Sequence, residues 1–156
     1  MQTATIHDLK KELENTPAPQ LIELCIRLAK YKKENKELLN YLLFESFDEN
    51  AYIENINNET DELFAEITQT NLYFVKKSIR KILRLINKHI RYTGSKEAEV
   101  RLLIHFCQKM TSSGIPFSKS TALDNLYKAQ LKKINKTLDT LHEDLRYDYI
   151  KMLKDL

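Results

Sequence analysis

The chain has 156 residues, of which 42% are hydrophobic and 30% are charged, and its formal net charge is +3 at pH 7. This balance is too apolar for a disordered protein, and it is too weakly basic for bulk charge alone to indicate nucleic-acid binding. With only 2 glycines and 3 prolines, both below their usual share, the composition favours helices over sheets and long loops. The sequence therefore predicts a single all-α domain, a helical bundle built from αα-hairpins over residues 1–156.

The first third of the chain predicts a short helix followed by a helical hairpin. Thr5 and Asp8 have the spacing of a capping box, which places the short helix at residues 6–14. Pro17 and Pro19 end that helix, and two helices joined by a few polar residues are expected over residues 19–45. A wide apolar face on the first helix of this hairpin predicts deep burial: Leu21, Ile22, Cys25, Ile26, Leu28 and Ala29.

Two helices of opposite charge come next. Apolar residues at a three- and four-residue spacing predict an acidic helix over residues 47–70, in which Thr60 fills one apolar position. A basic helix over residues 71–92 ends before Gly94, which favours helix termination, and Ser95 is a favourable cap for the helix that follows. Residues 37–66 contain no Lys or Arg and residues 67–96 contain no Asp or Glu, so the charge is divided into an acidic block and a basic block.

The last third predicts a helix over residues 96–110, a loop over residues 111–120 and one long helix over residues 121–154. A break near the segment HEDLRYDY is the alternative, because a single helix of that length would extend beyond a compact domain. The segments IRLAKY and LRLINK each precede a Lys-Glu pair that begins an apolar helix. If they form a true repeat, the hairpins stack as in a HEAT-like array, which is the alternative to an irregular bundle.

Seven basic residues lie within about 140° on one face of the helix over residues 71–92. They form the candidate binding face: Lys76, Lys77, Arg80, Lys81, Arg84, Lys88 and Arg91. Three interpretations remain open for this face. Asp61, Glu62 and Glu66 of the preceding helix neutralise it across the turn, or it meets a protein partner or a second copy, or it contacts nucleic-acid phosphates. A membrane contact is not expected, since the apolar stripe of this helix is needed for the core.

The sequence contains no recognisable catalytic, cofactor or metal site. His105 and Cys107 are two residues apart, which places them on nearly opposite sides of a helix. Asp139 and His142 have a carboxylate-x-x-His spacing, but no second copy of that pair occurs. Cys25 and Cys107 lie in apolar runs, which predicts reduced, buried and unreactive thiols. No enzyme activity and no small-molecule substrate are therefore expected.

The segments LIELCIRLAKYKKENKELLNYLLFE, KKSIRKILRLINKHIRY and TLHEDLRYDY resemble those of a family of short bacterial all-helical proteins that have no assigned function. The resemblance implies a bacterial cytoplasmic protein and supplies no functional residues. The apolar clusters are far shorter than a membrane span, and no signal-peptide core occurs near residue 1, so a cytoplasmic location is also expected from the residues. We expect a non-enzymatic module that binds a protein partner or a second copy, with nucleic-acid binding through residues 76–91 as the alternative.

Overall fold

The computed structural model describes all 156 residues, and its regular elements are helices without any strand, as the composition predicts. The chain divides into two compact units, Met1–Phe44 and Glu45–Leu156, where the sequence predicts a single domain. The division into two units reflects a difference in how many apolar side chains each unit buries. The second unit contains nearly all of the buried apolar side chains, whereas no helix of the first unit contains a buried residue.

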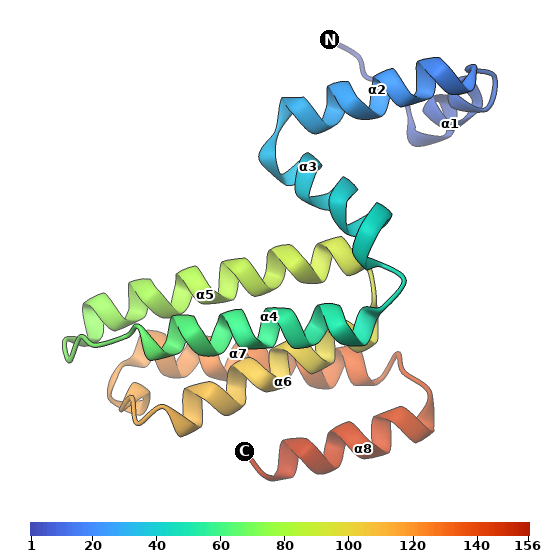
Figure 1. The fold of residues 1–156 in the computed structure, drawn as a ribbon. Helices are drawn as coiled ribbons and strands as arrows, with labels where there is room; N and C mark the ends of the chain where they lie inside the picture. The colour runs from blue at the N-terminus through green and yellow to red at the C-terminus, as the bar shows by residue number, and fades with distance from the viewer. The chain divides into compact units, whose positions relative to one another are not determined.

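The first unit contains α1 (Ile6–Glu14), α2 (Ala18–Tyr31) and α3 (Lys33–Asn40), and it ends within a π-helical turn, η1 (Tyr41–Glu45) (Figure 1). Thr5 caps α1 through reciprocal hydrogen bonds with Asp8, which confirms the predicted capping box. Only Lys32 separates α2 from α3, and its extended backbone turns the chain. The Asn35 side-chain amide donates to the carbonyl oxygen of Leu28 at 2.8 Å, so the first turn of α3 is fixed against the end of α2.

The second unit contains five helices in which consecutive members run antiparallel (Figure 1). They are α4 (Glu49–Ala65), α5 (Leu72–Thr93), α6 (Lys96–Ser112), α7 (Thr121–Leu138) and α8 (Glu143–Lys154), with a 3₁₀ turn, η2 (Phe117–Lys119), before α7. α6 lies at the centre and packs against α4, α5, α7 and α8. Nine of its 17 residues are buried, because its sequence is apolar around most of the helix circumference.

The core of the second unit is formed where α4, α5 and α7 pack against α6. Of the six residues predicted for the apolar stripe of α5, Leu83 is half-buried and the other five are buried: Val75, Ile79, Ile82, Ile86 and Ile90. Thr60 occupies a core position of α4, and its hydroxyl donates to the carbonyl oxygen of Ile56 at 2.8 Å. The rings of Phe64 and Phe106 meet with 5.8 Å between their centroids. α5 therefore has its apolar stripe in the core and its basic residues on the opposite side.

The turn between α5 and α6 forms at the two residues that the sequence predicts for it. Gly94 ends α5 with a φ of 60°, a left-handed conformation that glycine adopts without steric cost. The Ser95 side chain then accepts a hydrogen bond from the backbone N–H of Ala98 and so caps α6. The acidic helix is shorter than the predicted 47–70, because the Asp48 side chain caps it at its beginning and it ends at Ala65.

The single long helix predicted for residues 121–154 is wrong, and the break considered near residue 142 is present instead. α7 ends at Leu138, where the backbone N–H of Thr140 donates to the carbonyl oxygen of Thr137 at 3.0 Å and tightens the last turn. α8 then returns along α6 (Figure 1). There the Tyr149 hydroxyl donates to Glu97 Oε1 at 2.6 Å, a contact that a continuous helix would place out of reach.

Candidate functional site

The basic residues of α5 form one row along the side of the helix that faces away from the core. Lys77, Arg80, Lys81, Arg84 and Arg91 are exposed, whereas Lys76 and Lys88 are half-buried. A rise of 1.5 Å per residue spreads the row from residue 76 to residue 91 over about 22 Å. We call these seven residues the basic face of α5.

The interpretation in which Asp61, Glu62 and Glu66 neutralise Lys76, Lys77 and Arg80 across the turn is not supported by any ion pair between them. Asp61 instead lies 2.6 Å from His105 Nε2 and 3.5 Å from Lys109 Nζ, so its carboxylate interacts with side chains of α6. Glu62 and Glu66 are exposed and make no ion pair with Lys76, Lys77 or Arg80. The helices α4 and α5 are therefore neighbours in sequence and in space, but Asp61, Glu62 and Glu66 make no ion pair with the basic side chains of α5.

The exposed basic side chains lack carboxylate partners. No ion pair involves Lys77, Arg80, Lys81, Arg84 or Arg91. Their positive charges are held by the helix at fixed spacing and are available to an anion from solvent.

Two exposed aromatic residues stand at the beginning of the same row. Tyr73 and Phe74 are 54% and 49% exposed, and their rings meet edge to face with 5.3 Å between centroids. Lys77 Nζ lies 4.7 Å from the centroid of the Tyr73 ring, and Lys76 Nζ lies 5.6 Å from it. Cation–π contacts at these distances orient both lysines and hold the tyrosine ring beside them. The residue pattern did not single out this pair, although two adjacent aromatics separated from Lys76 and Lys77 only by Val75 are a recognisable signal.

A shallow groove runs between α4 and α5 on the same side. Its volume is about 400 Å³, and it is lined by Glu59, Leu63, Lys81, Arg84, Leu85 and Lys88. Apolar side chains form part of this lining, and charged side chains surround them. The groove is open to solvent along the basic face of α5, so it gives that face a concave edge.

A second surface of a different kind lies on the first unit. The residue pattern predicts that α2 is deeply buried, and this is wrong, because α2 contains no buried residue. The large apolar side chains exposed in residues 6–44 lie on both flanks of α2 and on the segments before and after it, and together we call them the apolar face of the first unit: Ile6, Leu9, Leu13, Ile22, Leu24, Ile26, Leu28, Tyr31, Leu42, Leu43 and Phe44. The signal was present in the sequence, since apolar residues cover about 220° of α2, more than one neighbouring helix can cover.

Within this face, α2 and α3 enclose an apolar groove of about 240 Å³. Its lining is almost wholly apolar: Cys25, Leu28, Ala29, Asn35, Leu38, Leu39 and Leu42. Cys25 is exposed, which corrects the prediction of a buried thiol, because the apolar run around it faces solvent. Cys107 is buried as predicted, and burial raises the pKa of its thiol to about 12.

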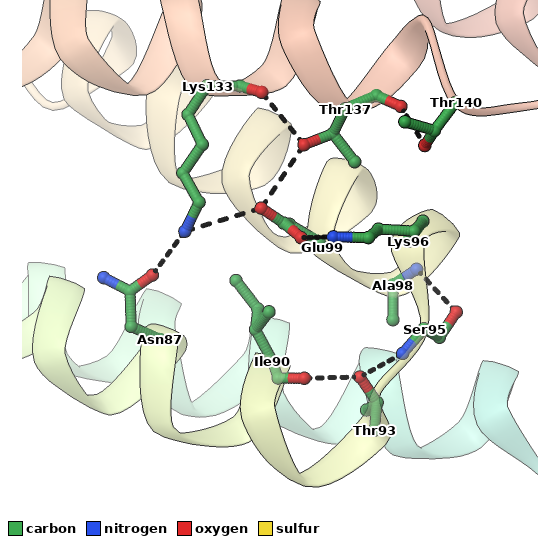
Figure 2. Close-up of polar contacts among 10 residues, drawn as sticks. All are labelled: Asn87, Ile90, Thr93, Ser95, Lys96, Ala98, Glu99, Lys133, Thr137 and Thr140. Atoms are coloured by element: carbon green, nitrogen blue, oxygen red, sulfur yellow. Dashed lines mark hydrogen bonds and ion pairs between the residues drawn. The ribbon is translucent and has the colours of Figure 1, made fainter.

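A buried polar network joins three helices of the second unit, and Figure 2 shows its members. Glu99 of α6 is 8% exposed, and one of its carboxylate oxygens accepts a hydrogen bond from the Thr137 hydroxyl of α7 at 3.3 Å. The same oxygen lies 3.5 Å from Lys133 Nζ, and the other lies 3.6 Å from Lys96 Nζ. Lys133 also donates to the Asn87 side chain of α5 at 3.1 Å. Glu99 of α6 thus contacts Lys133 and Thr137 of α7, and Lys133 in turn contacts Asn87 of α5, so the network links the three helices.

The residues examined for catalytic chemistry lie apart in the structure. His105 pairs with Asp61 on the α4–α6 interface, and Cys107 is buried in the core. Asp139 pairs with Arg146 at 3.0 Å, whereas His142 caps α8, so this carboxylate and this imidazole do not share a ligand position. The structure contains no group of three or more His, Cys, Asp or Glu side chains arranged to hold a metal ion.

Comparisons of the chain with family models, with curated proteins and with solved structures find no match. None of the helices is both long enough and apolar enough to cross a membrane. The two surfaces that remain as candidate sites are therefore the apolar face of the first unit and the basic face of α5, and each is interpreted from its own geometry.

Proposed function

We propose that this protein is a non-enzymatic interaction module that self-associates through the apolar face of the first unit. The observation that carries the proposal is the exposure of eleven large apolar side chains within 39 residues, 6–44. Partly exposed side chains of this size leave on the order of 100 Å² each uncovered, or on the order of 1,000 Å² in all. The largest contiguous apolar patch on a monomeric protein is usually about 300–600 Å², so even half of this total on one flank would lie at the upper end of that range.

The stability of the first unit supports the same conclusion. Isolated helices shorter than about 12–15 residues are marginal in water, and α1 and α3 have 9 and 8 residues. Such helices are stabilised by burying an apolar face, yet Tyr41 is the only buried residue among residues 1–44. A partner that covers the apolar face supplies this missing burial.

A second copy of the chain suits this face as the partner. A standard interface buries about 800 Å² on each side, which is close to the area exposed here. Residues 1–44 contain seven basic and six acidic side chains, so two such units carry almost no net charge with which to repel each other. In a two-fold symmetric dimer the same apolar surface meets itself, and its chemistry is self-complementary.

The proposed HEAT-like arrangement is one form of this assembly. Hairpin arrays need a polar outer face on their terminal hairpins, and the α2–α3 hairpin lacks one. The next hairpin of the stack then comes from the second copy. We place the module in a bacterial cytoplasm, where reducing conditions keep Cys25 and Cys107 as thiols.

The test is the mass of the full-length protein by sedimentation and light scattering over a wide range of concentration. We expect a dimer that is converted to a monomer by Leu28→Glu or Ile22→Glu, since both side chains are more than half exposed and tolerate the change in the monomer. Tyr147→Glu is the matched control, because Tyr147 is 72% exposed but lies on α8. A monomeric wild-type protein, or equal dissociation by the control, refutes the proposal.

Alkylation of Cys25 gives an independent measurement in the unmodified chain. The thiol lies in the apolar groove, so dimer formation should slow its reaction as protein concentration rises. Cys107 is buried and should not react in either state, which leaves Cys25 as the only reporter. Protection of Cys25 that does not depend on concentration would mean that the same chain covers the face, and it would contradict self-association.

A further inference from the structure

We propose that the basic face of α5, together with Tyr73 and Phe74, binds single-stranded nucleic acid. This inference does not depend on self-association, because it rests on a different surface in the second unit. Single-strand binding sites combine a positive track for the phosphates with aromatic side chains on which bases stack. The structure contains both parts on one helix and in order along it.

The phosphate track consists of the exposed, unpaired side chains of Lys77, Arg80, Lys81 and Arg84. Each of them lies three residues from one of the others and four residues from another, so the four gather on one side of the helix within about 100°. A basic row of this kind within a segment free of acidic residues is the electrostatic signature of phosphate-backbone contacts. Counterion release from the strand then supplies the affinity.

The aromatic pair favours unpaired bases over a duplex. The bases of a duplex already stack on each other, whereas a single strand can place a base against an exposed ring. Tyr73 and Phe74 are about half exposed, and their neighbours Lys76 and Lys77 are held beside them by cation–π contacts. A phosphate on Lys77 would therefore bring the adjoining base close to the Tyr73 ring.

An anionic membrane fits this face less well. A helix that binds a bilayer surface inserts its apolar side among the lipids. On α5 that side is in the core, where Ile79 and Ile86 are 0% and 1% exposed. The contact available to an anion is therefore charged and aromatic and has no apolar stripe, which favours a hydrated polyanion with stacking groups.

The test is a fluorescence-anisotropy titration of the full-length protein with labelled oligouridylate, chosen longer than the roughly 4–16 nucleotides that a compact site covers. Binding should weaken with salt by about 0.7 in log–log slope for each phosphate contact. Arg80→Gln/Arg84→Gln should therefore lower the slope by about 1.4 and weaken binding about 10-fold near physiological salt. Both arginines are exposed and unpaired, so the folded structure should tolerate the change.

The matched control is Lys132→Gln/Lys136→Gln, which removes the same charge from exposed positions of α7. It should leave the affinity unchanged within about 2-fold, because general charge effects are screened at this ionic strength. Tyr73→Ala should weaken single-strand binding by about 5- to 100-fold, the effect of losing one base stack. The same substitution should not change any binding to a hairpin duplex.

Several results would overturn the proposal. The basic face is not a phosphate site if oligouridylate does not bind at low salt, or if both double variants weaken binding equally. Binding of the hairpin duplex that equals single-strand binding and is insensitive to Tyr73→Ala would refute the stacking role. Stronger binding to phosphatidylserine vesicles than to oligouridylate would assign the face to a membrane surface instead.

Discussion

The buried carboxylate of Glu99 allows a stability prediction in which two physical effects can be separated. Glu99→Gln removes the negative charge but keeps the shape of the side chain, whereas Glu99→Ala removes the charge and a packed methylene together. The two lysines that pair with the carboxylate have side chains that are 63% and 43% exposed, so water screens both pairs. Each pair therefore contributes about 0–1 kcal/mol, and we expect Glu99→Gln to lower the free energy of unfolding by about 1 kcal/mol.

Glu99→Ala leaves no partner unsatisfied, which limits its cost. The Thr137 hydroxyl retains its hydrogen bond to the carbonyl oxygen of Lys133 at 3.0 Å, and Lys133 retains Asn87. The additional loss is the burial of one methylene, Cγ, at about 0.8 kcal/mol. Because alanine is a good residue for a helix interior, we expect a total loss of about 2 kcal/mol.

The assay is urea denaturation of the full-length protein, followed by far-ultraviolet circular dichroism. Glu62→Gln is the control, since Glu62 is an exposed, unpaired acid on α4, and its substitution should change the free energy of unfolding by less than about 0.5 kcal/mol. If Glu99→Gln costs more than about 3 kcal/mol, or as much as Glu99→Ala, the network behaves as a desolvated ion cluster, and the argument from lysine exposure is wrong.

Two further predictions concern the core and the response to alkali. Phe106→Ala should lower the free energy of unfolding by about 3–5 kcal/mol, because the ring is 0% exposed and its loss leaves a cavity beside Phe64; calorimetry of the variant checks this. Burial and the hydrogen bond to Glu97 raise the pKa of Tyr149 above its usual value. The raised pKa contributes to the free energy of unfolding below the pKa of an unfolded tyrosine, about 10, and this contribution is lost as the pH rises further. Tyr149→Phe should therefore reduce the fall in the free energy of unfolding at alkaline pH, as measured by urea titration. An unchanged decline in that variant would contradict the assignment.

Much of the local structure follows from short stretches of sequence. The capping box at Thr5, the glycine that ends α5 and the serine cap of α6 each act through neighbouring backbone groups. The apolar stripe of α5 was also predictable, because a period of 3.6 residues fixes which side chains share a face. The seven residues of the basic face of α5 lie on the predicted side for the same reason.

Two of the interpretations that the structure does not support involve residues that are distant in sequence. Asp61 was expected opposite the basic helix, but it pairs with His105, which is 44 residues away. Charge patterns show which residues can pair and do not show which helix lies closest. The deep burial expected for α2 failed for a related reason, since an apolar face indicates that a helix requires a partner without identifying that partner.

The sequence by itself determined the all-α class, most helix boundaries and the faces on which apolar and basic side chains lie, because these depend on backbone hydrogen bonding and helical periodicity within a few residues. Only the tertiary structure decided that α7 and α8 are separate helices and that Glu99 joins three helices. It also decided that Lys77, Arg80, Lys81, Arg84 and Arg91 make no ion pair, while large apolar side chains of residues 6–44 remain exposed. These features depend on which surfaces meet, and that is set by packing between helices rather than by any one of them.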